Sequence, residues 1–170
     1  MQELELKRKA YDRLLEWKKS SLGTTAVLIN GARRTGKSYL VRKFVEREYR
    51  SCIFIDFMKV SRGVKDSFEN DADNLDLLFS KLSLEYAVKL YPRESAIVFD
   101  EVELFPRARE MIKVLVEDGR FDYIETSSLL SIRTNSAGIL IPSEEEEIVL
   151  NPWISRSLSG RWATMSRFLC

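Results

Sequence analysis

The chain has 170 residues, 45% of them hydrophobic, which is enough to form one compact domain with a filled core. Its 27 basic and 26 acidic residues give a formal net charge of +1. This balance does not indicate a strongly electrostatic nucleic-acid binder, although a local basic patch would not show in the sum, so nucleic acid is not excluded. The absence of histidine excludes Ser-His-Asp and Cys-His catalysis and every His-ligated metal site.

Nothing in the sequence indicates contact with a membrane. No apolar run approaches the roughly 20 residues that cross a bilayer, and the N-terminus lacks the pattern of a signal peptide. We therefore expect a cytoplasmic protein without a membrane partner.

The first half of the chain predicts a helix followed by a strand–helix–strand unit. Residues 2–20 interleave leucine and aromatic residues with charges, which predicts an amphipathic helix against one edge of the core. The apolar run 26–29 is typical of a buried parallel strand. A helix with an apolar inner side follows over 37–49, and a second strand over 52–57. Residues 58–73 are polar and without a clear period, so we expect a surface loop there.

The second half continues the alternation of helices and strands, which predicts a three-layer α/β domain with a mostly parallel sheet. Asp73 or Asn74 is suited to cap a helix that Pro92 closes, and Asp118-Gly119 is suited to end another. The predicted elements are a helix to about residue 91, a strand at 96–99, a helix from Pro106 to Glu117, a strand at 121–125, and a further strand at 139–141 or 148–150, with the acidic run 144–147 in a solvated loop.

Residues 31–38 match G-x-x-x-x-G-K-[ST] at every fixed position, between an apolar strand and an amphipathic helix as this phosphate-binding loop requires. Gly31 is expected to let the chain turn out of the strand, and Gly36 to let the backbone approach the phosphates. Backbone N–H groups would form an anion-binding nest, Lys37 would reach the β and γ phosphates, and Ser38 would ligate Mg²⁺. The predicted nucleotide-binding residues are Gly31, Ala32, Arg33, Arg34, Thr35, Gly36, Lys37 and Ser38; the two arginines are equally suited to face solvent.

Polar residues at the ends of two later strands complete the predicted site. The apolar run 96–99 is followed by Asp100 and Glu101, at the strand end where open α/β sheets bind ligands. Asp100 is predicted to hold Mg²⁺ through water, and Glu101 to polarise the attacking water in ATP hydrolysis. Thr126 is the candidate for helping to place that water, with Ser128 second; both hydroxyls are also suited to cap the next turn.

Two arginines that follow the acidic pair have two open interpretations. A solvated helix face is the favoured interpretation; the alternative is that Arg107 or Arg109 acts as an arginine finger towards a neighbouring subunit.

The order of these motifs resembles a family of AAA-type ATPases of bacteria and archaea, whose P-loop core is followed by an uncharacterised C-terminal domain. The resemblance runs from about Arg8 to Pro152 and implies an ATP- and Mg²⁺-binding domain with strand order 5-1-4-3-2. That family usually has glycine where this chain has Ser127. If the glycine supplies a positive φ angle, Ser127 is expected to strain the loop beside the nucleotide.

The resemblance stops near Pro152, where the composition changes. Family members continue with a Pro-x-x-Phe-x-Glu-Phe-like segment and a larger domain, whereas residues 153–170 are rich in Ser, Arg and Trp. If the codons of the tail are read in a frame shifted one base earlier, those of Trp153 and Ile154 always yield an aspartate. A permissible choice of the other codons then gives a continuation like that of the family. We therefore expect three parts: an N-terminal helix (1–20), an ATPase core (21–152) and an out-of-frame tail (153–170), with a real, divergent tail as the alternative.

The sequence thus predicts an ATP-binding domain with Mg²⁺-dependent hydrolysis, through a Walker A motif at 31–38 and a Walker B motif at 96–101, and weak activity in this form. A nucleotide-dependent signalling or assembly module without turnover, or a non-functional fragment, is the alternative. ATP is the predicted ligand. The sequence leaves open whether the macromolecular partner is a second copy of the chain, in a homo-oligomer, or a protein client.

Overall fold

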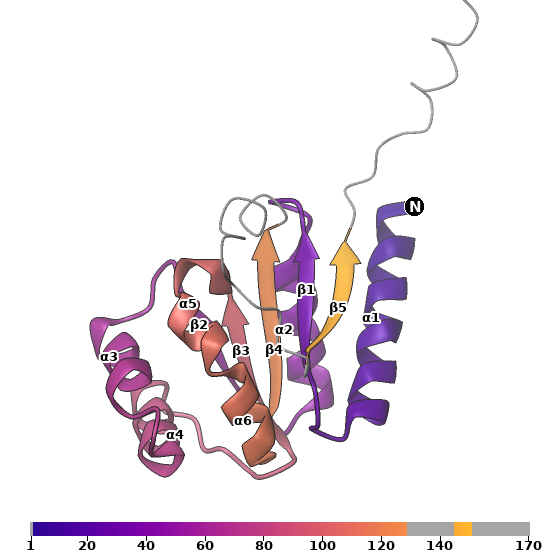
Figure 1. Ribbon diagram of the computed structural model, residues 1–170. Coiled ribbons are helices and arrows are strands. Elements are labelled where there is room, and N and C mark those ends of the chain that lie inside the picture. The colour runs from indigo at the N-terminus through magenta and orange to yellow at the C-terminus, as the bar shows by residue number, and fades with distance from the viewer. Residues whose placement is uncertain (1, 129–144, 151–170) are drawn as a thin grey trace, which may run out of the picture.

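The computed structural model describes residues 2–128 and 145–150, with side chains from residue 9 onward. Within this part of the chain, five parallel strands form one sheet in the order β2-β3-β4-β1-β5, with helices on both faces (Figure 1). Read from the other edge, this is the predicted order 5-1-4-3-2. The strands are β1 (Ala26–Gly31), β2 (Ser51–Asp56), β3 (Ser95–Asp100), β4 (Asp122–Ser128) and β5 (Glu145–Leu150).

The three central strands position the site. Every residue of β1, β3 and β4 is buried, because helices cover both faces of the sheet. Their register pairs Gly31 with Ser128 and Phe99 with Glu125. The carboxyl ends of these strands therefore meet at one edge of the sheet, as the sequence predicts for a ligand-binding edge.

One face of the sheet packs against α1 (Gln2–Ser21) and α2 (Lys37–Glu48), and α1 confirms the predicted N-terminal helix. Leu14 and Trp17 of α1 are buried with Phe44 of α2. The Trp17 indole Nε1 donates to Thr25 Oγ1 at 3.1 Å, which ties the end of α1 to the start of β1. None of the described helices is long and apolar enough to cross a membrane.

The other face packs against the remaining helices around a cluster of aromatic rings. Phe57 stacks on Phe105 with ring centroids 5.3 Å apart, and Phe68 meets Phe99 edge-on at 5.6 Å. The helices on this side are α3 (Arg62–Asn70), α4 (Leu75–Glu85), the 3₁₀ helix η1 (Val102–Leu104), α5 (Pro106–Glu110) and α6 (Ile112–Asp118).

Helix α3 corrects the prediction that 58–73 is a surface loop. Its N-cap residue Ser61 accepts a hydrogen bond from Val64 N at 3.3 Å, and Val64 and Phe68 bury one side of the helix. The segment looked aperiodic because α3 itself has only these two buried apolar side chains, four residues apart.

Two other predicted helices are shorter than expected. Asn74 caps α4 as predicted, but the helix ends at Glu85 rather than near residue 91, and Ala87 beyond it has a left-handed φ of 52°. The predicted helix from Pro106 to Glu117 is divided at Met111 into α5 and α6, and Gly119 ends α6 with a φ of 68°.

Strand β5 contains the acidic residues 145–147, so the prediction of a solvated loop there is wrong. Tertiary contacts place these residues in a strand. Arg109 Nη2 donates to Glu145 Oε2 at 3.0 Å, and Asn30 Nδ2 donates to Glu147 Oε1 at 2.8 Å. Of the two predicted positions for a further strand, 148–150 lies in β5, whereas 139–141 lies outside the described residues, as does the predicted out-of-frame tail.

Candidate functional site

The glycine-rich loop 31–38 leaves the carboxyl end of β1 and leads into α2. A Cβ atom on Gly31 would lie 2.4 Å from the carbonyl oxygen of Leu150, so a glycine is needed here because β5 passes close by. The sequence predicted a glycine here because the chain would turn out of the strand. Gly31 is instead the last residue of β1, and the nearby β5 is the reason for the glycine. Gly36, just before α2, has a φ of 82°, which a residue with a side chain rarely adopts.

Lys37 is held across the loop. Its side chain is buried, 4% exposed, and Nζ donates to the carbonyl oxygens of Gly31 and Ala32, each at 3.0 Å. An ammonium group has three donors, so one remains for a phosphate oxygen. Burial lowers the pKa of Lys37, and the nearby carboxylates of Glu101, Glu103 and Asp100 partly offset this effect.

The carboxylate of Asp100 joins three segments of the chain. Its Oδ1 atom accepts hydrogen bonds from Ser38 Oγ at 2.8 Å and from Thr126 Oγ1 at 2.5 Å. Thr126 Oγ1 in turn accepts from the backbone N of Glu101 at 3.0 Å. The structure therefore brings the loop, the end of β3 and the end of β4 to one carboxylate, and Thr126 bridges the acidic pair.

The carboxyl groups of Glu101 and Glu103 are near enough for each to shift the pKa of the other. Burial, followed by the neighbouring carboxyl of Glu103, raises the pKa of Glu101 to about 7, and Lys37 acts against this rise. Burial also acts to raise the pKa of Glu103, but hydrogen bonds from Ser128 and from the backbone outweigh it, so that pKa is lowered. The negative charge of the pair therefore lies mainly on Glu103.

Sequence reasoning missed Glu103. The residue lies in η1, and its Oε1 atom accepts from the backbone N of Ser128 at 3.1 Å and from Ser128 Oγ at 2.8 Å. Ser128, the second candidate at the end of β4, is therefore in the site but contacts Glu103 rather than Asp100. The only sequence signal was a third acid three residues after Asp100, which is also typical of a solvated turn.

Two expectations about nearby residues are wrong. Ser127 lies within β4 and is not among the residues with positive φ, so it introduces no left-handed strain. Arg109 is 5% exposed and its guanidinium is bound to Glu145 of the same chain, which excludes both a finger towards another subunit and a solvated face. Arg107, by contrast, fits the solvated helix face, because 42% of its side chain is exposed and it pairs with the exposed Glu110 at 3.3 Å.

The other loop residues contribute differently. Thr35 Oγ1 donates to the Ala32 carbonyl oxygen at 2.9 Å and so closes the loop on itself. Arg33 and Arg34 are exposed, and Arg34 has a left-handed φ of 64°. Both guanidinium groups are therefore accessible at the rim of the loop.

The donor atoms at this edge fit a magnesium ion shared with a nucleotide. Ser38 and Asp100 offer a hydroxyl and a carboxylate oxygen 2.8 Å apart, both hard donors. In nucleotide sites Mg²⁺ typically takes one or two such protein oxygens and completes its shell with phosphates and water.

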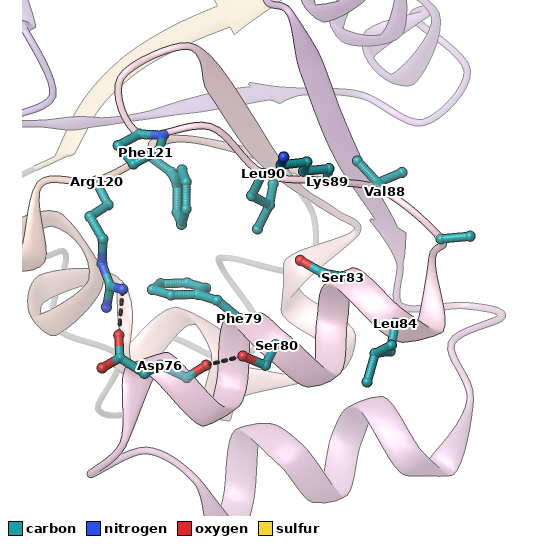
Figure 2. A pocket seen from close by; sticks show the side chains of 12 residues that line it. Asp76, Phe79, Ser80, Ser83, Leu84, Val88, Lys89, Leu90, Arg120 and Phe121 are labelled. Carbon is teal, nitrogen blue, oxygen red and sulfur yellow. Dashed lines mark hydrogen bonds and ion pairs between the residues drawn. The ribbon is translucent and has the colours of Figure 1, made fainter.

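A separate hollow of about 570 Å³ lies at the opposite end of the sheet, and Figure 2 shows its lining. Phe79 of α4 and Phe121 meet edge-on at 4.9 Å, and Arg120 donates to Asp76 at 2.5 Å. Since residues 120 and 121 directly precede β4, this hollow adjoins the amino ends of the strands. It is therefore distinct from the site around Lys37 and Asp100.

An α/β domain with an all-parallel sheet in this order and a glycine-rich loop after β1 defines the P-loop class of nucleotide-binding proteins. The sequence matches the AAA domain family over residues 23–165, so the chain belongs to that family. No curated protein matches the sequence.

Several solved structures are similar to this chain, and one with a TM-score above 0.5 supports the fold. A chain in the structure of Drosophila ORC bound to AT-rich DNA and Cdc6 is 9% identical, with a TM-score of 0.54, over 92% of this chain and 60% of that one. C. elegans PCH-2 matches with a TM-score of 0.40 at 14% identity, over 86% of this chain and 39% of that one. The Pif1 helicase from Candida albicans matches with a TM-score of 0.45 at 12% identity, over 88% and 40%. The chain thus spans less than two thirds of each matched chain.

Proposed function

We propose that this AAA domain binds ATP with Mg²⁺ and hydrolyses it to ADP and phosphate. The observation that carries the proposal is the convergence on Asp100 Oδ1, which accepts from Ser38 of the loop at 2.8 Å and from Thr126 of β4 at 2.5 Å. A loop that only connected a strand to a helix would need neither a buried lysine nor a serine hydroxyl that donates to a carboxylate.

Each residue has a distinct part in the proposed reaction. The N–H groups at the start of α2 and the ammonium of Lys37 bind the phosphates. Ser38 and Asp100 hold the metal ion, which, when bound, neutralises charge on the phosphates. Glu101 accepts a proton from the attacking water, a role for which a pKa near neutrality is suited. Thr126 holds the backbone of Glu101 and the carboxylate of Asp100 in place.

A single-turnover experiment with protein in excess over radiolabelled ATP tests hydrolysis. We expect Glu101→Gln to bind ATP with unchanged affinity. We expect it to release phosphate at least about 10²-fold more slowly than the wild type. Glu110→Gln, an exposed glutamate on α5, is the matched control and should keep the wild-type rate. Equal rates for wild type and Glu101→Gln would refute the role of Glu101.

The second candidate is a nucleotide-dependent assembly module without significant turnover. The raised pKa of Glu101 favours it, because a pKa of about 7 leaves part of this carboxyl protonated near pH 7, where it cannot accept a proton from water. In that case the wild type would bind ATP and release phosphate no faster than Glu101→Gln.

A further inference from the structure

The exposed face of α2 carries a positive charge that the near-neutral total of the chain hides. Residues 31–50 contain seven basic and two acidic side chains, a net charge of +5 in a chain with a formal total of +1. Lysines and arginines gathered along one helix are typical of a surface that meets the phosphates of nucleic acid. We propose that this face binds single-stranded nucleic acid, a function that goes beyond ATP hydrolysis and does not depend on it.

Four neighbouring side chains of α2 define this surface, which we call the basic face. All four are exposed, and together with Glu46 they line a hollow of about 280 Å³; they are Tyr39, Arg42, Lys43 and Arg47. Tyr39, Lys43 and Arg47 follow one another at intervals of four residues, about 6 Å along the helix axis. Pockets for whole small molecules are larger, at about 300–1,000 Å³. The hollow is therefore suited to one base or one phosphate group of a longer chain.

The cations of the basic face are not neutralised within the described part of the domain. Among residues 9–128 and 145–150, no ion pair includes Arg42, Lys43 or Arg47. The guanidinium carbon of Arg42 lies over the ring of Phe54, 4.0 Å from its centroid. This cation–π contact restrains the guanidinium, whose planar fork matches a phosphate group. Because Glu46 is the single carboxylate beside three cations, the hollow keeps an excess of positive charge.

Tyr39 distinguishes single-stranded nucleic acid from other polyanions. It is 62% exposed, and among the residues with described side chains it is the only exposed aromatic one. A base of a single strand can stack on such a ring, whereas the bases of a duplex stack on one another and an acidic peptide has none. Lys43 Nζ lies 5.9 Å from the centroid of the ring, where it can meet the phosphate next to a stacked base.

The basic face is separate from the proposed phosphate site. Lys37, which belongs to that site, precedes Tyr39 by two residues, a rotation of about 200° around the helix. Lys37 is accordingly buried and Tyr39 exposed. Substitutions on the basic face should therefore leave the dissociation constant for ATP unchanged.

Fluorescence anisotropy of a labelled oligothymidine of about 20 nucleotides, titrated with the full chain at several salt concentrations, tests the charges. We expect saturable binding by the wild type. The double variant Arg42→Ala with Arg47→Ala should reduce the slope of log K against log[salt] by about 1.4 in magnitude, because each phosphate contact to a single strand contributes about 0.7. The control, Arg62→Ala with Lys113→Ala, removes the same charge from exposed positions on the other face of the sheet and should keep the wild-type slope.

Variants of Tyr39 test the stacked base in the same assay. Tyr39→Ala should weaken binding of the oligothymidine by about five- to a hundredfold, because it removes the ring. Tyr39→Phe keeps the ring and should keep the wild-type affinity. Binding of a duplex of the same length should not respond to Tyr39→Ala, since its bases are already stacked.

Several results would overturn the assignment: no saturable binding by the wild type, an equal change of slope in the control variant, wild-type affinity in Tyr39→Ala, or an equal loss for the duplex. Displacement of the oligothymidine by polyglutamate of matched charge at equal concentration would identify an acidic protein as the partner instead. A loss of ATP affinity in step with the loss of oligothymidine binding would place the effect in the nucleotide site. If the double variant does not fold, because Arg42 covers Phe54, Arg47→Ala alone must reduce the slope by about 0.7.

Discussion

The close approach of β5 to Gly31 predicts a steric penalty for Gly31→Ala. The added Cβ would lie 2.4 Å from the Leu150 carbonyl oxygen and 3.0 Å from its Cβ, whereas ordinary contacts begin at 3.4 Å. The edge strand would therefore have to move by about 1 Å, and overpacking of this kind costs about 1–3 kcal/mol. For a domain of this size, that corresponds to a fall in Tm of roughly 2–12 °C.

Thermal unfolding followed by circular dichroism measures this effect, with Gly63→Ala as the matched control. Gly63 lies in α3, and its Cβ would meet only Ser61 Oγ at 3.8 Å. Alanine is better than glycine in a helix by about 1 kcal/mol, so Gly63→Ala should raise Tm by about 2–4 °C. A Tm for Gly31→Ala at or above the wild-type value would refute the reasoning.

Three further predictions concern buried polar residues. Thr126→Val removes one of the two hydroxyl donors to Asp100 and leaves the N–H of Glu101 without its acceptor. It should lower the free energy of unfolding in urea by about 1–3 kcal/mol; an unchanged value would contradict the bridge. Arg109→Met leaves the buried carboxylate of Glu145 on β5 without its charge partner and should lower the free energy of unfolding by about 3–5 kcal/mol. A loss under about 1 kcal/mol would argue against the ion pair. Burial, followed by the carboxyl of Glu145, raises the pKa of Glu125 well above its usual range, so the native state favours the protonated form. The stability that this gives is complete below the usual glutamate pKa of about 4.3 and is lost as the pH rises towards the raised value. Glu125→Gln should therefore become more stable relative to wild type from acidic to neutral pH, and a pH-independent difference in Tm would contradict this.

The core of the fold was predictable because local signals were strong. The glycine-rich loop matches a strict pattern, and its position after a buried strand is confirmed. Asn74 begins α4 through side-chain capping and Gly119 ends α6 through its positive φ, and both effects depend on nearby residues alone. The strand order followed from the resemblance rather than from any single segment.

What escaped prediction depends on contacts distant in sequence. Arg109 is buried because Glu145, 36 residues away, supplies its charge partner, and the acidic β5 is a strand because β1 pairs with it. Glu103 is likewise recognisable only once the end of β4 brings Ser128 beside it. Helix α3 was the exception, since Ser61 before a turn of polar residues was a local capping signal.

The central claim is that the loop at 31–38 binds the phosphates of ATP through Lys37. Isothermal titration of the chain with ATP and Mg²⁺ tests it most directly, with Lys43→Ala, an exposed lysine of the same helix, as the control. We expect saturable binding of one ATP to the wild type and to Lys43→Ala, and no detectable binding to Lys37→Ala. Equal affinity of the wild type and Lys37→Ala for ATP would contradict it.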